Sequence, residues 1–168
     1  MKRNTKMALA LFLGALGTAI EARAECQEGQ YLRGSIAETR IASPNDPLGR
    51  FLSNVTGVLN GAGTVFATGT PPNLTSFDTF VTTQGDMLTA IGRPTRTPIP
   101  GAPPGEFSVH VELTITGGSG KYAGATGWMT FDGQGHNAFG GVGVNTVDLV
   151  YRGCVSCPNI KADGNPPQ

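Results

Sequence analysis

The sequence predicts an all-β protein, an antiparallel barrel of about eight strands, and three observations carry this prediction. Residues 107–116 alternate strictly between apolar and polar side chains over ten positions. A glycine-dense stretch, residues 117–127, then reverses the chain into a second β-rich segment. After residue 25, no stretch of useful length has the apolar spacing of a helix. A sheet with one apolar face must close on itself or pack on a second layer, so a closed barrel is expected, with a two-sheet β-sandwich as the alternative.

Turn-forming residues divide the chain into eight strand-like segments. They are residues 30–38, 50–59, 64–68, 76–82, 87–92, 107–116, 127–131 and 146–152. The pair Asn60–Gly61 predicts a tight hairpin. Five prolines fall within residues 93–105 and cannot donate to a strand ladder, so we expect a surface loop there that includes Arg93 and Arg96. The last segment places Val147, Leu149 and Tyr151 on one face.

The reversal at 117–127 has a structural role. Glycine adopts positive φ without steric cost, and glycines here flank the large side chain of Tyr122. This arrangement predicts that the loop folds back and covers one end of the sheet. The residues expected to form this turn are Gly117, Gly118, Gly120, Tyr122, Gly124 and Gly127.

Residues 115–127, with residues 59–64 and 83–90, resemble the allene-oxide-cyclase-like barrels, a calycin-like group that also includes plant dirigent proteins. The likeness is strongest to small exported bacterial members and covers roughly residues 50–155. It implies an eight-stranded barrel with a central cavity and, in many relatives, a homo-oligomer. Plant relatives cyclise an unsaturated fatty-acid epoxide or orient phenoxy radicals during coupling. We do not assign those activities to this chain, because its residues cannot be matched position by position to the cavity residues of the plant proteins.

The N-terminus has the pattern of an export signal. Lys2, Arg3 and Lys6 precede the 14-residue apolar run 7–20, and Ala22-Arg23-Ala24 supplies a cleavage pattern. The run is too short for a bilayer core, which needs about 20 residues. We therefore expect residues 1–24 to be a cleaved signal peptide, residues 25–157 a single barrel domain and residues 158–168 a polar, disordered tail. The expected location is secreted or periplasmic, with no membrane anchor after cleavage.

The charge balance indicates no polyanionic partner. Four of the 12 basic and one of the 12 acidic residues lie in the predicted leader, which leaves eight basic and eleven acidic side chains. These show no basic cluster, so we expect no nucleic-acid binding. With two histidines in the whole chain, we expect neither a metal nor a cofactor.

The three cysteines are Cys26, Cys154 and Cys157. In a closed up-and-down barrel the start of the first strand meets the end of the last, so a disulfide from Cys26 to Cys154 is expected, with Cys157 as the alternative partner. A redox-active pair at Cys154–Cys157 is the competing interpretation. It is less favoured because these residues follow a strand rather than opening a helix.

The remaining polar candidates are few. His110 and Glu112 share the polar face of one strand and could transfer a proton, but a solvated outer face or an oligomer contact is the favoured interpretation. His136 falls in a predicted exposed loop with Asp132 and Gly133. No Ser-His-Asp or Cys-His order is readable, and no pair of carboxylates stands out.

We expect the aromatic side chains to form the core, and Tyr151, Trp128 and Phe107 to line any ligand cavity. The sequence favours a non-catalytic barrel that binds a small apolar molecule, or one that acts as a structural or interaction module. The alternative function is a cyclase or isomerase, whose apolar cavity positions a reactive substrate. Catalytic residue types are scarce, which favours the non-enzymatic interpretation.

Overall fold

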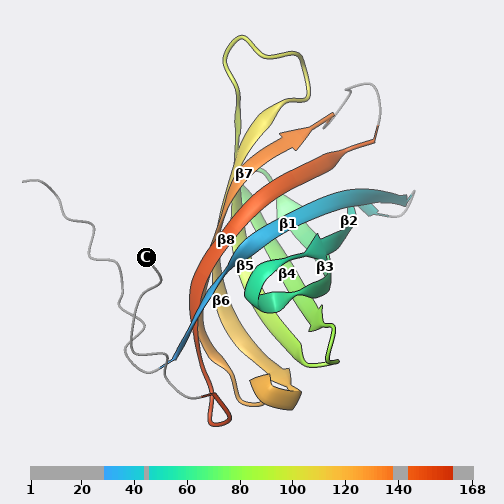
Figure 1. Ribbon diagram of the computed structural model, residues 1–168. Helices are drawn as coiled ribbons and strands as arrows, with labels where there is room; N and C mark the ends of the chain where they lie inside the picture. Colours follow the sequence, from blue (N-terminus) through green and yellow to red (C-terminus); the bar gives the residue numbers. More distant parts are fainter. Residues whose placement is uncertain (1–28, 44–45, 138–143, 161–168) are drawn as a thin grey trace, which may run out of the picture.

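The computed structural model describes residues 29–43, 46–137 and 144–160 as one closed antiparallel barrel (Figure 1). Its strands follow the chain order around the barrel, and two short 3-10 helices, η1 and η2, sit between strands at one end. The elements are β1 (Gln30–Ser43), β2 (Asp46–Val55), η1 (Gly57–Leu59), β3 (Gly61–Thr70), β4 (Asn73–Thr82), β5 (Met87–Pro98), β6 (Phe107–Ser119), η2 (Gly120–Tyr122), β7 (Thr126–His136) and β8 (Thr146–Ser156).

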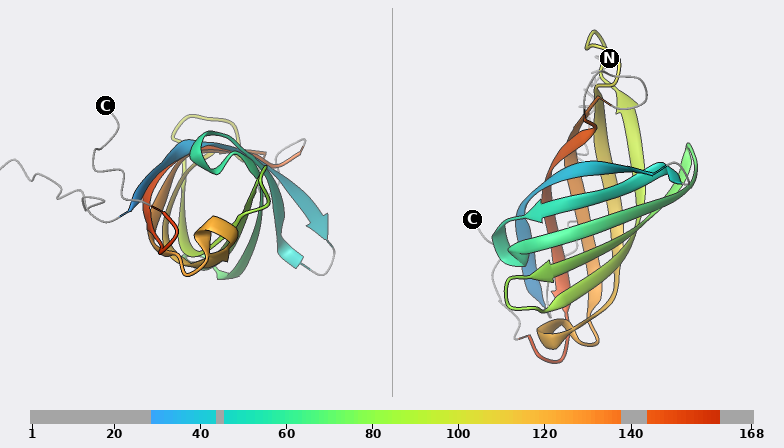
Figure 2. Two further views of the ribbon diagram at one scale, coloured as in Figure 1. Left: turned by 60° about the horizontal axis from the view of Figure 1, so that its bottom comes forward. Right: turned by 90° about the vertical axis from the view of Figure 1, so that its right-hand side faces the viewer.

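Closure comes from the pairing of β1 with β8. Their register runs continuously from Gln30 opposite Val155 to Thr39 opposite Thr146, and Figure 2 shows the resulting ring of strands. The predicted eight-stranded antiparallel barrel is therefore confirmed, and the sandwich alternative is excluded. The predicted leader 1–24, Cys26 and residues 161–168 of the predicted tail lie outside the described residues.

Alternation fills the barrel interior as the pattern of residues 107–116 predicts. Every second residue of β6 from Phe107 to Ile115 is buried, and the residues between them are exposed. Glycine occurs where a larger residue would collide with a buried ring. A Cβ on Gly135 would lie 2.1 Å from the ring of Phe107, its cross-strand neighbour. Burial of such side chains is the main stabilising contribution to folding.

The two ends of the barrel differ. We call the end that carries η1 and η2 the base, and the end reached by the β3–β4 and β5–β6 connections the mouth. At the base Tyr122 is fully buried, so the glycine-rich reversal does fold back over the barrel end. Gly120 has φ +61° there, and a Cβ on it would lie 2.1 Å from Asp86 Oδ1, the atom that accepts the Lys121 N–H at 2.9 Å.

The predicted loop over residues 93–105 is wrong in its first half, because β5 continues to Pro98. Pro94 lies opposite Val111 of β6, and Arg96 lies opposite Val109. The pairing of β5 with β4 ends at Gly92. Beyond that residue β5 has a strand partner on one side only, and proline is tolerated in such an edge position.

Two further local predictions are wrong. Residues 57–59 form η1 rather than the end of a strand, and Asn60 has φ −43° and ψ 115°, which is not the positive φ of a two-residue Asn-Gly hairpin. The positive φ falls instead on Gly57, at +84°. Residues 132–136 are strand β7, not a loop, so His136 lies in regular structure.

In the part of the chain that the structure describes, no helix has the length and apolar character needed to cross a membrane.

Candidate functional site

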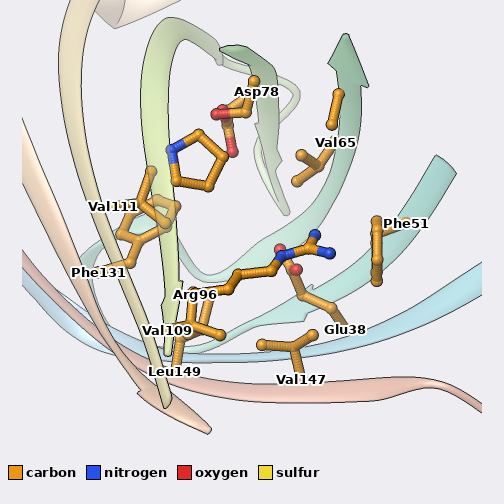
Figure 3. A pocket seen from close by; sticks show the side chains of 13 residues that line it. Glu38, Phe51, Val65, Asp78, Arg96, Val109, Val111, Phe131, Val147 and Leu149 are labelled. Carbon is orange, nitrogen blue, oxygen red and sulfur yellow. The ribbon is translucent and has the colours of Figure 1, made fainter. Parts of the chain in front are cut away.

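A small cavity of about 40 Å³ lies inside the barrel, in the half toward the mouth. Its walls are mostly apolar, but two carboxyl groups and a guanidinium face it (Figure 3). Every strand of the barrel except β1, β4 and β5 contributes only apolar side chains. The lining residues are Glu38, Phe51, Val65, Ala67, Ser76, Asp78, Pro94, Arg96, Val109, Val111, Phe131, Val147 and Leu149.

Glu38 enters the interior because β1 continues inward in phase with Leu32 and Ile36, both of them buried. Its side chain is 7% exposed and accepts a hydrogen bond from Ser53 Oγ at 3.1 Å. Burial, together with the nearby Asp78 charge, raises the pKa of Glu38 to about 7, against the opposing effects of Ser53 and Arg96. A buried carboxyl group with such a pKa changes its protonation state near neutral pH.

Asp78 faces the same cavity from β4 and is 3% exposed. Ser76 Oγ donates a hydrogen bond to Asp78 Oδ2 at 2.7 Å. Burial raises the pKa of Asp78 to about 7, although the Ser76 hydrogen bond acts in the opposite direction. The Asp78 charge is also one of the causes that raise the pKa of Glu38, so the titration of Glu38 depends on the protonation state of Asp78.

Arg96 brings a positive charge to the site from β5. Figure 3 shows its guanidinium beside the Glu38 carboxyl group, with Asp78 across the cavity. Burial lowers the pKa of Arg96, while the Glu38 charge raises it and Arg40 lowers it. The guanidinium carbon also lies 5.4 Å from the ring centre of Phe107, a cation–π distance.

This arrangement separates the roles of the two carboxyl groups. The Arg96 guanidinium lowers the pKa of Glu38, whereas no guanidinium is among the causes that set the raised pKa of Asp78, so Arg96 biases a proton held by the pair toward Asp78. A protonated Asp78 can donate a hydrogen bond, and an ionised Glu38 can accept one, across an apolar-walled space. The site can therefore bind a polar group that both accepts and donates, and it can exchange a proton with that group.

The aromatic residues expected at a ligand cavity lie elsewhere. Tyr151 is 2% exposed, and its hydroxyl donates to Thr56 O at 2.8 Å and accepts the Leu59 N–H at 2.9 Å. These two hydrogen bonds hold η1 against β8 at the base of the barrel. Trp128 is half-buried on the outer phase of β7, next to the buried Met129. Phe107 is buried near the mouth and reaches the cavity only through its contact with Arg96.

Both histidines contact carboxylates of acidic side chains on the outside of the barrel. His110 Nδ1 is 2.7 Å from Asp132 Oδ1, and Arg152 Nη2 is 3.2 Å from Asp132 Oδ2. The hydrogen bond with His110 is the main cause that lowers the pKa of Asp132. His136 Nδ1 contacts Glu106 Oε2. Within the described ranges, no group of three or more His, Cys, Asp or Glu side chains is arranged to hold a metal ion.

The C-terminal cysteines differ in state. Cys154 is disulfide-bonded, whereas Cys157 is a buried free thiol that donates to Lys121 O at 3.2 Å. Cys26, the expected partner of Cys154, lies outside the described residues, so that pairing stays a prediction.

Sequence reasoning missed Glu38 and Asp78 as a pair, although one signal was available. Continuing the alternation of Leu32 and Ile36 by one step places Glu38 on the inner face. The residues around Asp78 give no such signal. The large apolar residues Phe77 and Phe80 point to opposite faces of β4, so the pattern does not indicate which face of this strand is buried.

Comparison of the chain with protein-family models, with curated proteins and with solved structures finds no match.

Proposed function

We propose that this protein is an exported binding barrel whose mouth-side interior receives the polar end of a small, largely apolar molecule. The observation that supports this function is the pair of buried carboxyl groups, Glu38 and Asp78, facing an apolar-walled cavity. Buried ionisable groups are costly to maintain. Their presence in a cleft, with strongly raised pKa values, is typical of a functional site.

The size of the cavity limits what enters it. About 40 Å³ holds one or a few water molecules, so a ligand places only its polar end between Glu38 and Asp78. Its apolar body then lies toward the mouth, and Arg96, a long and partly exposed side chain, must move to admit it. A neutral hydroxyl or carbonyl group suits the site better than an ion, because the Arg96 guanidinium already lies beside the Glu38 carboxyl group and opposes its charge.

Export is part of the proposal. The support comes from the cationic start, the short apolar run and the cleavage pattern of residues 1–24. N-terminal sequencing of protein recovered from outside the cytoplasm should begin at Glu25. Recovery of Met1 or of the apolar run at the N-terminus would contradict it.

Native mass spectrometry of protein purified from its own host tests the binding function. We expect an additional mass of a small molecule on the wild-type protein. Ala67→Leu adds three carbon atoms to the cavity wall and should abolish that mass, whereas Val150→Leu, on the outer face of β8, should retain it. Thermal melting checks that both variants are folded. A wild-type protein without a bound molecule, or equal occupancy in a folded Ala67→Leu variant, would contradict binding at this cavity.

A second candidate is proton-transfer catalysis, an isomerase or cyclase activity in the same cavity. It is favoured by the pKa of about 7 for both Glu38 and Asp78, since general acids and bases work best near the operating pH. The resemblance to allene-oxide-cyclase-like barrels points in the same direction. Incubation of the recovered molecule with protein in heavy water distinguishes the two functions: a catalyst forms a deuterated isomer over many turnovers, and Glu38→Gln abolishes this, whereas a binding protein returns the molecule unchanged.

A further inference from the structure

At the mouth the barrel wall divides between β4 and β5. The two strands pair with each other only as far as Ser76 opposite Gly92. Beyond that pair each strand continues with its other neighbour alone, so residues 73–75 of β4 pair with β3 and residues 93–98 of β5 pair with β6. We call these two segments the arms of the fork, and the pair Ser76–Gly92 its vertex. The right-hand panel of Figure 2 shows the tips of the β3–β4 and β5–β6 hairpins apart from each other.

The barrel wall also divides between β1 and β8, but there the two sides remain linked. The register of β1 with β8 ends at Thr39 opposite Thr146. One residue further, the Arg40 N–H still donates to Asn145 O at 2.9 Å. Among the described strands, the fork is therefore the part of the mouth where two neighbours in the ring run on without strand pairing between them.

The fork leads directly into the cavity. The cavity wall includes Ser76 at the vertex, and Pro94 and Arg96 on the β5 arm. A Cβ on Gly92 would lie 2.6 Å from Ser76 Oγ, so glycine at the vertex leaves this hydroxyl free to donate to Asp78 at 2.7 Å. The polar end of the site and the fork are therefore continuous.

The inward side chains of the arms are apolar apart from Arg96. Leu74 follows Ser76 on the inner face of β4 and is 6% exposed, and Pro94 is buried on the inner face of β5. The route along the barrel axis differs, because the buried ring of Phe107 occupies it with the Arg96 guanidinium 5.4 Å from the ring centre. A molecule that extends from the cavity thus meets apolar side chains in the fork and a packed ring along the axis.

We propose, on the basis of the binding function above, that the fork is the subsite for the apolar body of the bound molecule, which passes between Leu74 and Pro94 while its polar end meets Asp78. Paired strands lie about 4.8 Å apart, and the arms separate outward from that spacing. The fork therefore admits a flat or chain-like body rather than a bulky one. Leu74 and Pro94 are the residues that select this body, because they are the apolar groups that it covers.

Equilibrium binding of prodan, a flat and neutral naphthalene dye with a ketone at one end, tests the subsite by fluorescence anisotropy. Thr75 and Arg93 are the first outward-facing residues of the two arms beyond the vertex. A disulfide in Thr75→Cys/Arg93→Cys would draw the arms to a Cβ separation of about 3.8 Å. Oxidation of this variant should weaken prodan binding at least about tenfold relative to its reduced form.

The matched control is Phe77→Cys/Ile91→Cys, which joins two directly opposite residues on the paired side of the vertex. It should bind prodan equally when oxidised and reduced. The disulfide at Cys154 is common to both double variants, so the control accounts for its reduction.

Leu74→Trp tests the same subsite without cysteines, and it alone decides if the disulfide across the fork does not form. Its indole occupies the fork and should weaken prodan binding at least about tenfold, whereas Val150→Trp, on the outer face of β8, should bind prodan as the wild type does. Thermal melting confirms that each variant is folded.

Two results overturn the inference, and both differ from a failure of the binding function. The first is a wild-type protein that does not bind prodan, in which case the native mass spectrum still decides whether a molecule is bound. The second is prodan binding that Ala67→Leu abolishes but that folded Leu74→Trp leaves unchanged. That result keeps the cavity as the binding site and places the apolar body along the barrel axis.

Discussion

Replacing Asp78 by asparagine should stabilise the protein at alkaline pH. Burial raises the pKa of Asp78 from its ordinary 3.8 to about 7, so between these pH values the folded state binds more protons than the unfolded state. The free energy of unfolding therefore falls as pH rises from about 4 to about 7 and changes little above that. At about 1.4 kcal/mol for each pKa unit, the upper limit of this loss is about 4 kcal/mol.

Asparagine removes the charge while its amide oxygen can still accept the hydrogen bond from Ser76. The Asp78→Asn variant should therefore match the wild type at about pH 4 and exceed its free energy of unfolding by up to about 4 kcal/mol at about pH 8. Part of the gain comes through Glu38, because the Asp78 charge is one cause of its raised pKa.

Urea unfolding, followed by the fluorescence of the single tryptophan Trp128, measures this difference at both pH values. Asp148→Asn is the matched control, since the Asp148 side chain is 70% exposed and its substitution should leave the pH dependence unchanged. The reasoning is refuted if Asp78→Asn is less stable than the wild type at about pH 8, or if the wild-type stability is flat across the range.

Three further outcomes are expected. Tyr151→Phe should lower the free energy of unfolding by about 1–3 kcal/mol, because two backbone groups at η1 lose their buried partner; unchanged urea unfolding would show that water replaces the hydroxyl. Gly135→Ala should cost about 1–3 kcal/mol through its clash with the Phe107 ring, and Phe107→Leu in the same chain should recover part of this, whereas additive effects would contradict a direct contact. Non-reducing peptide mapping should recover Cys26 linked to Cys154, and a bridge within the C-terminal cysteine pair would disprove that link.

The barrel could be predicted because the strands that define it are regular. The ten-residue alternation of β6 fixes which face is buried, and the glycine-rich reversal after it allows β7 to return alongside. One long amphipathic strand and several short turns leave few architectures open. The existence of eight strands therefore followed from local pattern alone.

Strand ends and the site could not be predicted in the same way. Proline at 94 indicated a loop, but the structure tolerates it because β5 has lost its β4 neighbour by that point. Whether β5 still has a β4 neighbour at Pro94 depends on the relative lengths of β4 and β5, which the local sequence pattern does not indicate. Glu38 and Asp78 are 40 positions apart in the sequence and face the same cavity only because the closed barrel directs one side of β1 and one side of β4 inward. The raised pKa values of the two carboxyl groups therefore depend on the tertiary structure.

The pairing of the first strand with the last has a consequence for how the chain acquires its structure. Gln30 and Val155 are neighbours in the closed ring, so the seam cannot form until nearly the whole polypeptide is available. Contacts of such large sequence separation make folding slow, and an incomplete chain would present two unpaired sheet edges. Under the export that we propose, this order of events keeps the chain unfolded enough to pass through a translocation channel until its final strand has been delivered.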